Sequence, residues 1–316
     1  MNIYQQIQSN NHKTWAVVTI FVIFFGFIGY GFDYFYFGGQ LPIFTFVALG
    51  ISFLSIYLSF QYGDRFILHS SHARLLDLND SKEKQWQNIV EEMTIASGLA
   101  RVPTTYVIDD SDPNAFATGI NPQTASIAVT KGLLNSLNRE ELQGVAAHEM
   151  SHIKNYDVRF MLFVSVLVGA IVLLSDWATR IFRYTTASRG RSRDKSSSGG
   201  PILLIMLVIW LIAVILAPIL SQLIAMCVSR SRESLADASG AEISRNPLAL
   251  ASALEKIDSA IGPTKSITRG TAALCICDPQ ARPLDSKEGW FANLMATHPP
   301  IQKRIEALQQ MAYIKQ

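Results

Sequence analysis

Four long apolar segments divide this sequence and limit the folds that it can adopt. They occupy residues 15–30 (with an extension to residue 37), 43–62, 158–177 and 201–228. A helix needs roughly 20 apolar residues to cross the hydrocarbon core of a bilayer. Hydrophobic residues make up 49% of the chain and charged residues only 16%, which is low for a soluble protein. We therefore predict four membrane helices, arranged as two hairpins within residues 1–62 and 158–228.

The segments outside these hairpins, residues 63–157 and 229–316, are predicted to form one water-exposed domain that the second hairpin interrupts. An amphipathic pattern predicts a helix from Lys84 to Gly98. Three short strands are expected at residues 105–108, 114–118 and 126–129. The fold class is mainly α with a small β-sheet. A net charge of +2 argues against a nucleic-acid partner, and three cysteines do not form a disulfide framework.

The sequence His148-Glu149-Met150-Ser151-His152 is an HExxH pattern on a predicted helix. Residues four apart on a helix point the same way, so His148 and His152 present two imidazoles to one point. They are a suitable pair of zinc ligands. Glu149 can reach a water on the same metal and take its proton. Asn138 and Glu141 have capping-box spacing at the start of this helix.

A third metal ligand is available after the fourth apolar segment, where Glu233 and Asp237 share a helix face. Acidic pairs of this spacing are common on solvated helix faces. Joined to HExxH, they predict one Zn²⁺ per chain held by His148, His152 and Glu233, with one position open for water. Asp237 is predicted to accept the outer N–H of a ligand histidine.

The order of these motifs resembles the HtpX-like membrane zinc endopeptidases, which are relatives of the CAAX-prenyl endopeptidases. HExxH is followed, after a hydrophobic hairpin, by SRExxxD at residues 231–237. PNAFATG at residues 113–119 and THPP at residues 297–300 resemble two further segments of that family. The resemblance runs from about residue 104 to the end. It implies a gluzincin-like zinc peptidase domain that the third and fourth membrane helices split.

The middle predicted strand has two interpretations. It could belong to a plain β-meander, or it could be an edge strand beside the zinc that pairs with an extended peptide substrate. The second interpretation makes a set of neighbouring residues substrate-binding: Asn114, Ala115, Phe116, Ala117, Thr118 and Gly119. His298 of the THPP segment is either a capping or packing residue, or an active-site residue that binds the oxyanion or the zinc.

The topology follows from the need for a shared metal. His148 and His152 precede the second hairpin and Glu233 follows it, so residues 158–228 must cross the membrane an even number of times. Arginines after the second and fourth apolar segments place the domain in the cytoplasm. The basic loop at residues 180–195 argues the other way, since two full crossings would export it. Two explanations stay open: the loop is exported despite its charge, or the hairpin enters the bilayer without fully crossing it. We predict a bacterial inner-membrane protein whose active site faces the cytoplasm.

The predicted function is that of an integral-membrane zinc endopeptidase. Glu149 takes a proton from the zinc-bound water and returns it to the leaving amine. The resemblance implies a role in membrane protein quality control and stress response, with misfolded membrane proteins as substrates. Two alternatives remain open. One is a catalytically silent membrane adaptor that binds extended peptide segments, and the other is an endopeptidase for prenylated peptides.

Overall fold

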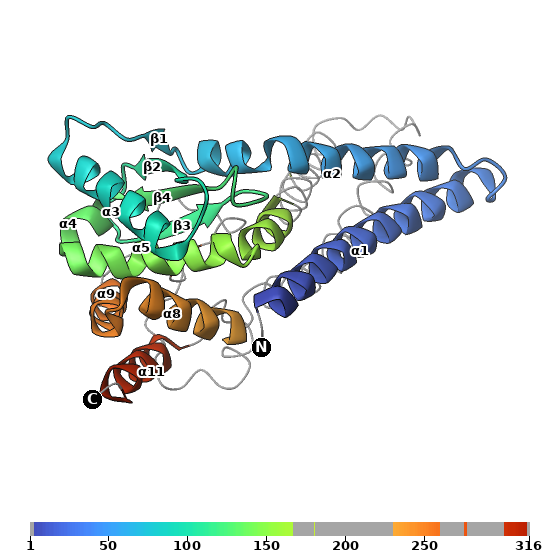
Figure 1. The fold of residues 1–316 in the computed structure, drawn as a ribbon. Helices are drawn as coiled ribbons and strands as arrows, with labels where there is room; N and C mark the ends of the chain where they lie inside the picture. The colour runs from blue at the N-terminus through green and yellow to red at the C-terminus, as the bar shows by residue number, and fades with distance from the viewer. Residues whose placement is uncertain (1–2, 167–179, 181–229, 260–274, 277–299, 315–316) are drawn as a thin grey trace, which may run out of the picture.

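A hairpin of two long helices extends from the part of the chain that holds the sheet (Figure 1). The computed structural model describes residues 3–166, 180, 230–259, 275–276 and 300–314. Helix α1 spans Ile3–Phe37 and helix α2 spans Ile43–Ser70. Both helices are longer than the apolar segments that predicted them. The polar residues at the start of α1 pack against residues 155–159, and the helix therefore begins before the apolar segment.

Two residues explain how the hairpin closes. Gly29 lies so close to α2 that a Cβ atom there would stand 2.6 Å from the Cα of Thr45, so a larger residue would push the helices apart. Asp33 is the one acidic residue in the first apolar segment. Its carboxylate accepts hydrogen bonds from the backbone N–H groups of Phe44 (2.8 Å) and Thr45 (2.9 Å). Asp33 thus satisfies backbone donors at the start of α2, where a helix has no internal partners for them.

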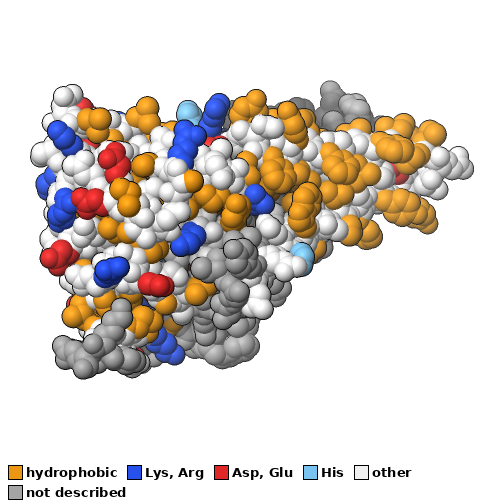
Figure 2. Space-filling model, in the orientation of Figure 1, with side chains coloured by type: hydrophobic (Ala, Val, Ile, Leu, Met, Phe, Trp, Pro, Cys, Tyr) orange, Lys and Arg blue, Asp and Glu red, His pale blue; other side chains and the backbone are white. Residues whose placement is uncertain are grey.

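The outer surface of the hairpin is apolar. Figure 2 shows hydrophobic side chains gathered over α1 and α2, with charged side chains over the opposite end of the molecule. Phe27 is 75% exposed and Phe46 is 69% exposed. Both helices are long and apolar enough to cross a membrane, and only 22% and 17% of their spanning windows are buried. Core helices of a soluble protein would be mostly buried, so these helices have the properties of membrane spans.

The second half of the third apolar segment and the whole of the fourth lie outside the described residues. Only residues 158–166 of the third segment are described, and they are helical. The prediction of four membrane helices, the basic loop at residues 180–195 and the division of the chain into two membrane hairpins and two domain parts therefore stay predictions.

The sheet has four strands in the order β1-β2-β4-β3. They span Arg74–Leu75 (β1), Thr104–Ile108 (β2), Ala115–Thr118 (β3) and Ser126–Thr130 (β4). β2 and β4 are parallel, while the other two pairs are antiparallel. β3 is the middle one of the three predicted strands, but it is the last strand in the described sheet. The β-meander interpretation was therefore wrong, because β2 and β4 pair in parallel. Among the described strands β3 lies at the edge, and its substrate-binding role remains a prediction.

The described residues include six further helices. They are α3 (Ser81–Ser97), α4 (Lys131–Ser136), α5 (Arg139–Lys154), α8 (Arg230–Ser244), α9 (Pro247–Asp258) and α11 (Ile301–Ile314). One hydrophobic cluster contains fully buried residues from both sides of the second predicted hairpin in the sequence. They include Trp86, Ile127, Met150, Leu254 and Leu308. Residues 63–157 and the described residues after 229 thus share one core.

The capping box predicted for the HExxH helix is present. Asn138 accepts a hydrogen bond from the backbone of Glu141 (2.9 Å), and Glu141 accepts one from the backbone of Asn138 (2.8 Å). The Glu141 carboxylate also accepts hydrogen bonds from Ser252 (2.7 Å) and Lys256 (2.8 Å) on α9. Burial alone would raise the pKa of Glu141. These hydrogen bonds, led by that of Lys256, outweigh burial and lower the pKa below its ordinary value of 4.5.

We expect Glu141→Ala to destabilise the protein by about 1–3 kcal/mol, since it removes buried hydrogen bonds at the start of α5. Thermal unfolding of the detergent-solubilised chain measures this change. Glu141 has a lowered pKa in the folded state, so its contribution is present above pH 4.5 and is lost as the pH falls below that value. The neighbouring Glu140→Ala is the control and is expected to change stability by less than about 0.5 kcal/mol. Equal effects of the two variants would contradict the prediction.

Candidate metal centre

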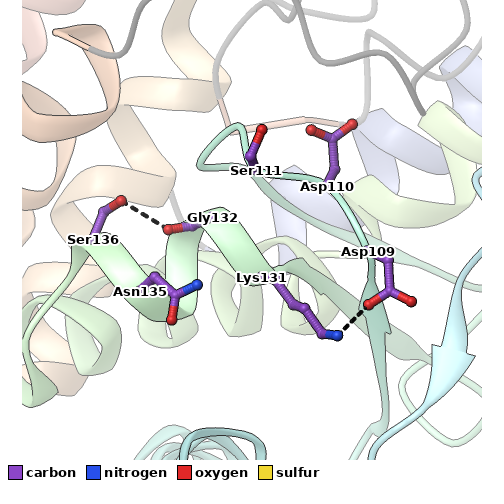
Figure 3. Close-up of a pocket in the computed structure, with 7 residues that line it drawn as sticks. All are labelled: Asp109, Asp110, Ser111, Lys131, Gly132, Asn135 and Ser136. Atoms are coloured by element: carbon purple, nitrogen blue, oxygen red, sulfur yellow. Dashed lines mark hydrogen bonds and ion pairs between the residues drawn. The ribbon is translucent and has the colours of Figure 1, made fainter.

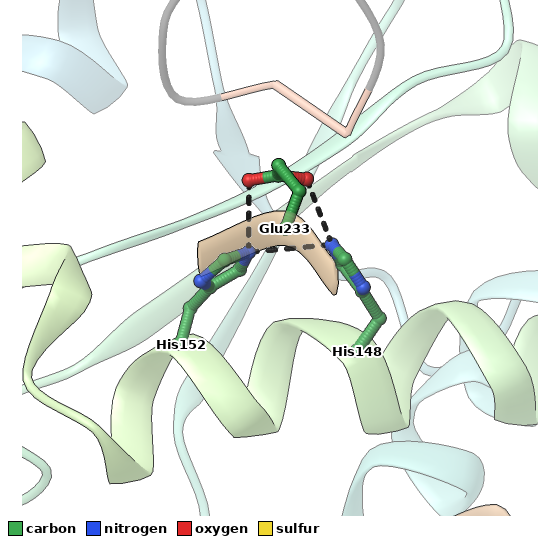
Figure 4. A group of neighbouring side chains, drawn as sticks. All are labelled: His148, His152 and Glu233. Carbon is green, nitrogen blue, oxygen red and sulfur yellow. Dashed lines mark hydrogen bonds and ion pairs between the residues drawn. The ribbon is translucent and has the colours of Figure 1, made fainter. Parts of the chain in front are cut away.

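Three side chains from two distant parts of the sequence meet at one point. His148 and His152 project from α5 toward Glu233 on α8 (Figure 4). The Nε2 atoms of the two histidines are 3.3 Å apart. Oxygens of Glu233 lie 3.7 Å from Nε2 of His148 and 3.6 Å from Nε2 of His152. The structure thus brings all three predicted ligands together, with one ligand atom from each within 4.8 Å of the others.

A glycine allows the two helices to approach this closely. α8 passes α5 at Gly240, where an added Cβ would lie 3.0 Å from the backbone nitrogen of His148. That distance is too short for an ordinary contact, so a larger side chain would force α8 away from α5. Gly240 lies on the helix that carries Glu233 and Asp237, and close packing at this point keeps both carboxylates near the histidines.

Each imidazole is backed by a carboxylate on its outer nitrogen. Nδ1 of His148 lies 3.1 Å from Asp237, and Nδ1 of His152 lies 3.0 Å from Asp157. Such contacts fix which nitrogen carries the proton and leave Nε2 free to face a metal. Asp237 is where the sequence predicted it, beside His148. Asp157 was missed, although its position five residues after His152, just beyond the end of α5, is a signal that could have found it.

Arg304 on α11 is a second residue that the sequence did not predict. Its guanidinium is buried and binds both oxygens of Asp237, at 2.8 and 2.7 Å. It also lies 3.4 Å from Glu233 and donates a hydrogen bond to the backbone carbonyl of Ile276 (3.0 Å). Burial alone would raise the pKa of Asp237, but the charge of Arg304 and contacts with Arg304 and His148 lower it. Arg304 therefore keeps Asp237 ionised behind His148.

Glu149 is buried beside the edge strand. Its carboxylate accepts a hydrogen bond from the backbone N–H of Ala117 on β3, and burial raises its pKa despite the nearby histidines. The outer edge of β3 is not fully open. Cys275 forms an isolated antiparallel β-bridge with Phe116. The backbone N–H of Ile276 donates a hydrogen bond to the carbonyl of Ala115 (3.0 Å). Within the described residues, this edge of β3 is thus already contacted by Glu149 at Ala117 and by residues 275–276 at Ala115 and Phe116.

The remaining predicted substrate residues form part of the same edge. Asn114 is buried immediately before β3, and Thr118 ends the strand. Gly119 has a φ of 139° and no room for a side chain, since a Cβ would lie 2.8 Å from the Cα of Ala125. Glycine is therefore required where the strand turns away. His298 lies outside the described residues, so its role stays a prediction.

The electrostatics of the cluster favour a cation. Burial lowers the pKa of His152, but the hydrogen bond to Asp157 and the charges of Glu233, Asp157 and Glu149 outweigh burial and raise the pKa to about 9. The carboxylates around His152 therefore favour positive charge at this point of the structure. Two imidazoles and one carboxylate are also the donor set of many catalytic zinc sites. The residues present therefore fit a zinc ion.

A separate surface hollow of about 380 Å³ lies between the loop after β2 and helix α4 (Figure 3). Lys131 and Asp109 form an ion pair across it at 2.6 Å. The Lys131 hydrogen bond lowers the pKa of Asp109. None of the described metal-centre residues lines this hollow. It is therefore distinct from the candidate metal centre.

The chain is similar to several known proteins. A model of Peptidase family M48 matches residues 80–312, a range that contains every residue of the metal centre described above. A Protease HtpX homolog from Dictyoglomus turgidum is 41% identical over 308 residues, which cover 98% of this chain and 94% of the relative. A Protease HtpX homolog from Streptococcus pneumoniae is 38% identical over 315 residues, which cover 98% of this chain and 100% of the relative. The crystal structure of S. mikatae Ste24p matches with a TM-score of 0.49 and 17% identity, and the match covers 96% of this chain and 67% of that one.

Proposed function

This chain belongs to peptidase family M48 and is a metalloprotease, and from that premise we propose that it is an integral-membrane zinc endopeptidase. Membership of the family confirms the resemblance that the sequence motifs indicated, and it favours an enzyme over the catalytically silent adaptor. One observation carries the proposal. His148, His152 and Glu233 converge on a single point, and Glu149, next to His148 in the sequence, contacts the backbone N–H of Ala117 on β3.

His148, His152 and Glu233 would hold the zinc ion and leave one position open. Bound zinc polarises a carbonyl and lowers the pKa of a water molecule from 15.7 to about 7. Asp237 and Asp157 hold the two imidazoles in the orientation in which Nε2 faces the ion. Arg304 holds Asp237 in turn.

Glu149 acts as the general base and then as the general acid. Its carboxylate is buried next to the ligands, and its raised pKa suits a group that accepts a proton from water and returns it to the leaving amine. The proton moves to a Glu149 oxygen as the water attacks the scissile carbonyl. The same oxygen protonates the amine nitrogen when the C–N bond breaks.

The substrate backbone pairs with β3. This strand ends the described sheet, so its outward backbone groups can bind an extended peptide by strand addition. The Ala117 N–H contacts the Glu149 carboxylate, which supports a scissile bond close to this residue. Asn114 to Gly119 thus orient the substrate, although the carbonyl of Ala115 is already bonded to Ile276. His298 is proposed to stabilise the oxyanion.

The site faces the cytoplasm at the membrane surface, in our proposal, with segments of misfolded membrane proteins as substrates. The end of the α1–α2 hairpin near the metal centre carries Lys13 and Arg65, with Arg74 just beyond it, whereas the turn at residues 38–42 carries no charge. Positive residues favour the cytoplasmic side of a membrane. Substrates that emerge from the bilayer would meet β3 within a short distance, which suits protein quality control.

Removal of the metal tests the proposal. We expect the detergent-solubilised chain to cleave casein, to lose that activity in a chelator, and to regain it when stoichiometric Zn²⁺ is added but not when Mg²⁺ is added. Imidazole nitrogens bind zinc far better than magnesium, which prefers oxygen ligands and keeps its water. Cleavage is measured by the release of labelled peptides. Activity that survives complete removal of zinc would overturn the proposed function.

A further inference from the structure

Asn10 is a buried polar residue at the start of the first membrane helix, far in sequence from the metal centre. Its side chain is 1% exposed. Its amide nitrogen donates one hydrogen bond to the backbone carbonyl of Asn155 (3.0 Å) and another to Oδ1 of Asp157 (2.6 Å). A backbone carbonyl and a carboxylate only accept hydrogen bonds, so the amide must face them with its nitrogen.

These two contacts lead directly to a metal ligand. Asp157 uses its other oxygen, Oδ2, to contact Nδ1 of His152 at 3.0 Å. Asn155 caps the end of α5, the helix that carries both histidines. One side chain on α1 therefore holds both the carboxylate behind His152 and the end of the HExxH helix.

The surrounding contacts hold Asn10 in place. Thr14 donates a hydrogen bond to the Asn10 backbone carbonyl (2.9 Å). Further along α1, Val17 and Phe21 pack in a buried cluster with Phe160 and Phe163, which follow Asp157 in the chain. The position of α1 and the position of Asp157 are thus fixed against each other by apolar packing as well as by hydrogen bonds.

We propose that Asn10 is a positioning residue for the metal centre, which makes the first membrane helix a structural part of the active site. Asn10 sets the orientation of the Asp157 carboxylate, and Asp157 sets the imidazole of His152. This inference rests on the proposed function, because it assigns Asn10 a role in metal binding. If Asn10 served only to dock α1, its loss would lower stability and leave the affinity for zinc unchanged.

The test compares Asn10→Leu with Asn11→Leu in the full-length chain in detergent. Asn11 is the matched control, since it accepts a hydrogen bond from Arg159 (3.1 Å) and belongs to the same helix end. Zinc affinity is measured by competition with a chromophoric chelator. We expect Asn10→Leu to weaken zinc binding roughly tenfold, the lower end of the range for residues that support a ligand. It should lower kcat with little change in KM. Asn11→Leu should leave zinc affinity within about twofold of the wild type.

A double-mutant cycle with Asp157→Ala shows whether Asn10 acts through Asp157. We expect Asn10→Leu to cause no further loss of zinc affinity once Asp157 has been replaced, because the linking carboxylate is gone. The stability of the metal-free variants is measured by thermal unfolding, independently of zinc affinity. Unchanged zinc affinity in Asn10→Leu, or additive losses in the double variant, would overturn the inference alone. A wild-type chain that binds no zinc would instead overturn the proposed function.

Discussion

Glu149→Gln is expected to abolish peptide cleavage while the protein keeps its metal. The amide has the shape of the carboxylate but cannot accept a proton from water, and general acid–base catalysis contributes about 10²–10⁴-fold to a rate. None of the three ligands changes, so elemental analysis should find the wild-type amount of zinc. Activity is measured with casein. The same variant tests the substrate class in cells, where fragments of membrane proteins should accumulate with the wild type and be absent with the variant.

Glu140→Gln is the matched control for that experiment. Glu140 lies in the first turn of the same helix, where it accepts a hydrogen bond from Asn246 at the surface. The same change of carboxylate to amide at this position should leave cleavage unaffected. Full activity in Glu149→Gln, with zinc bound, would show that another group accepts the proton.

Glu233→Ala is expected to remove the metal as well as the activity. The substitution deletes one of three ligands, so the loss of zinc affinity should exceed the roughly 10–100-fold loss that is typical of an outer supporting residue. It also leaves Arg304 with one carboxylate fewer, although Asp237 still binds its guanidinium at two points. The protein should therefore remain folded. Zinc content is measured by elemental analysis and folding by circular dichroism.

The control on the same helix is Glu242→Ala, which removes an exposed carboxylate and should leave zinc content and activity unchanged. If Glu233→Ala bound zinc as tightly as the wild type, Glu233 would not be a ligand. The agreement between sequence motifs and the convergence of α5 and α8 would then have another cause.

The sequence predicted the parts of the centre that follow from local geometry. His148, Glu149 and His152 lie within one helical turn, so their relative positions depend only on the period of the helix. The capping box at Asn138 is local in the same way. Helix geometry alone could not assign Glu233. Its assignment rested on two further arguments: a metal site needs a third ligand, and the motifs resemble those of the family.

The residues that the sequence did not predict act over long distances. Arg304 reaches Asp237 from another helix, and Asn10 reaches Asp157 across 147 positions in the sequence. No periodic pattern connects such residues, because their contacts depend on how the helices pack in three dimensions. The strand at residues 114–118 shows the same limit, since its composition predicted a strand but could not decide between a meander and a sheet edge.

The wide sequence separation of the metal-centre residues also has a consequence for biosynthesis. His152 and Glu233 lie on either side of two apolar segments, and Arg304 follows later still. These groups can therefore all meet only after the ribosome has synthesised the chain beyond Arg304. A partly translated chain carries HExxH but has no complete set of ligands. We therefore expect a nascent chain that stops before Glu233 to have no protease activity.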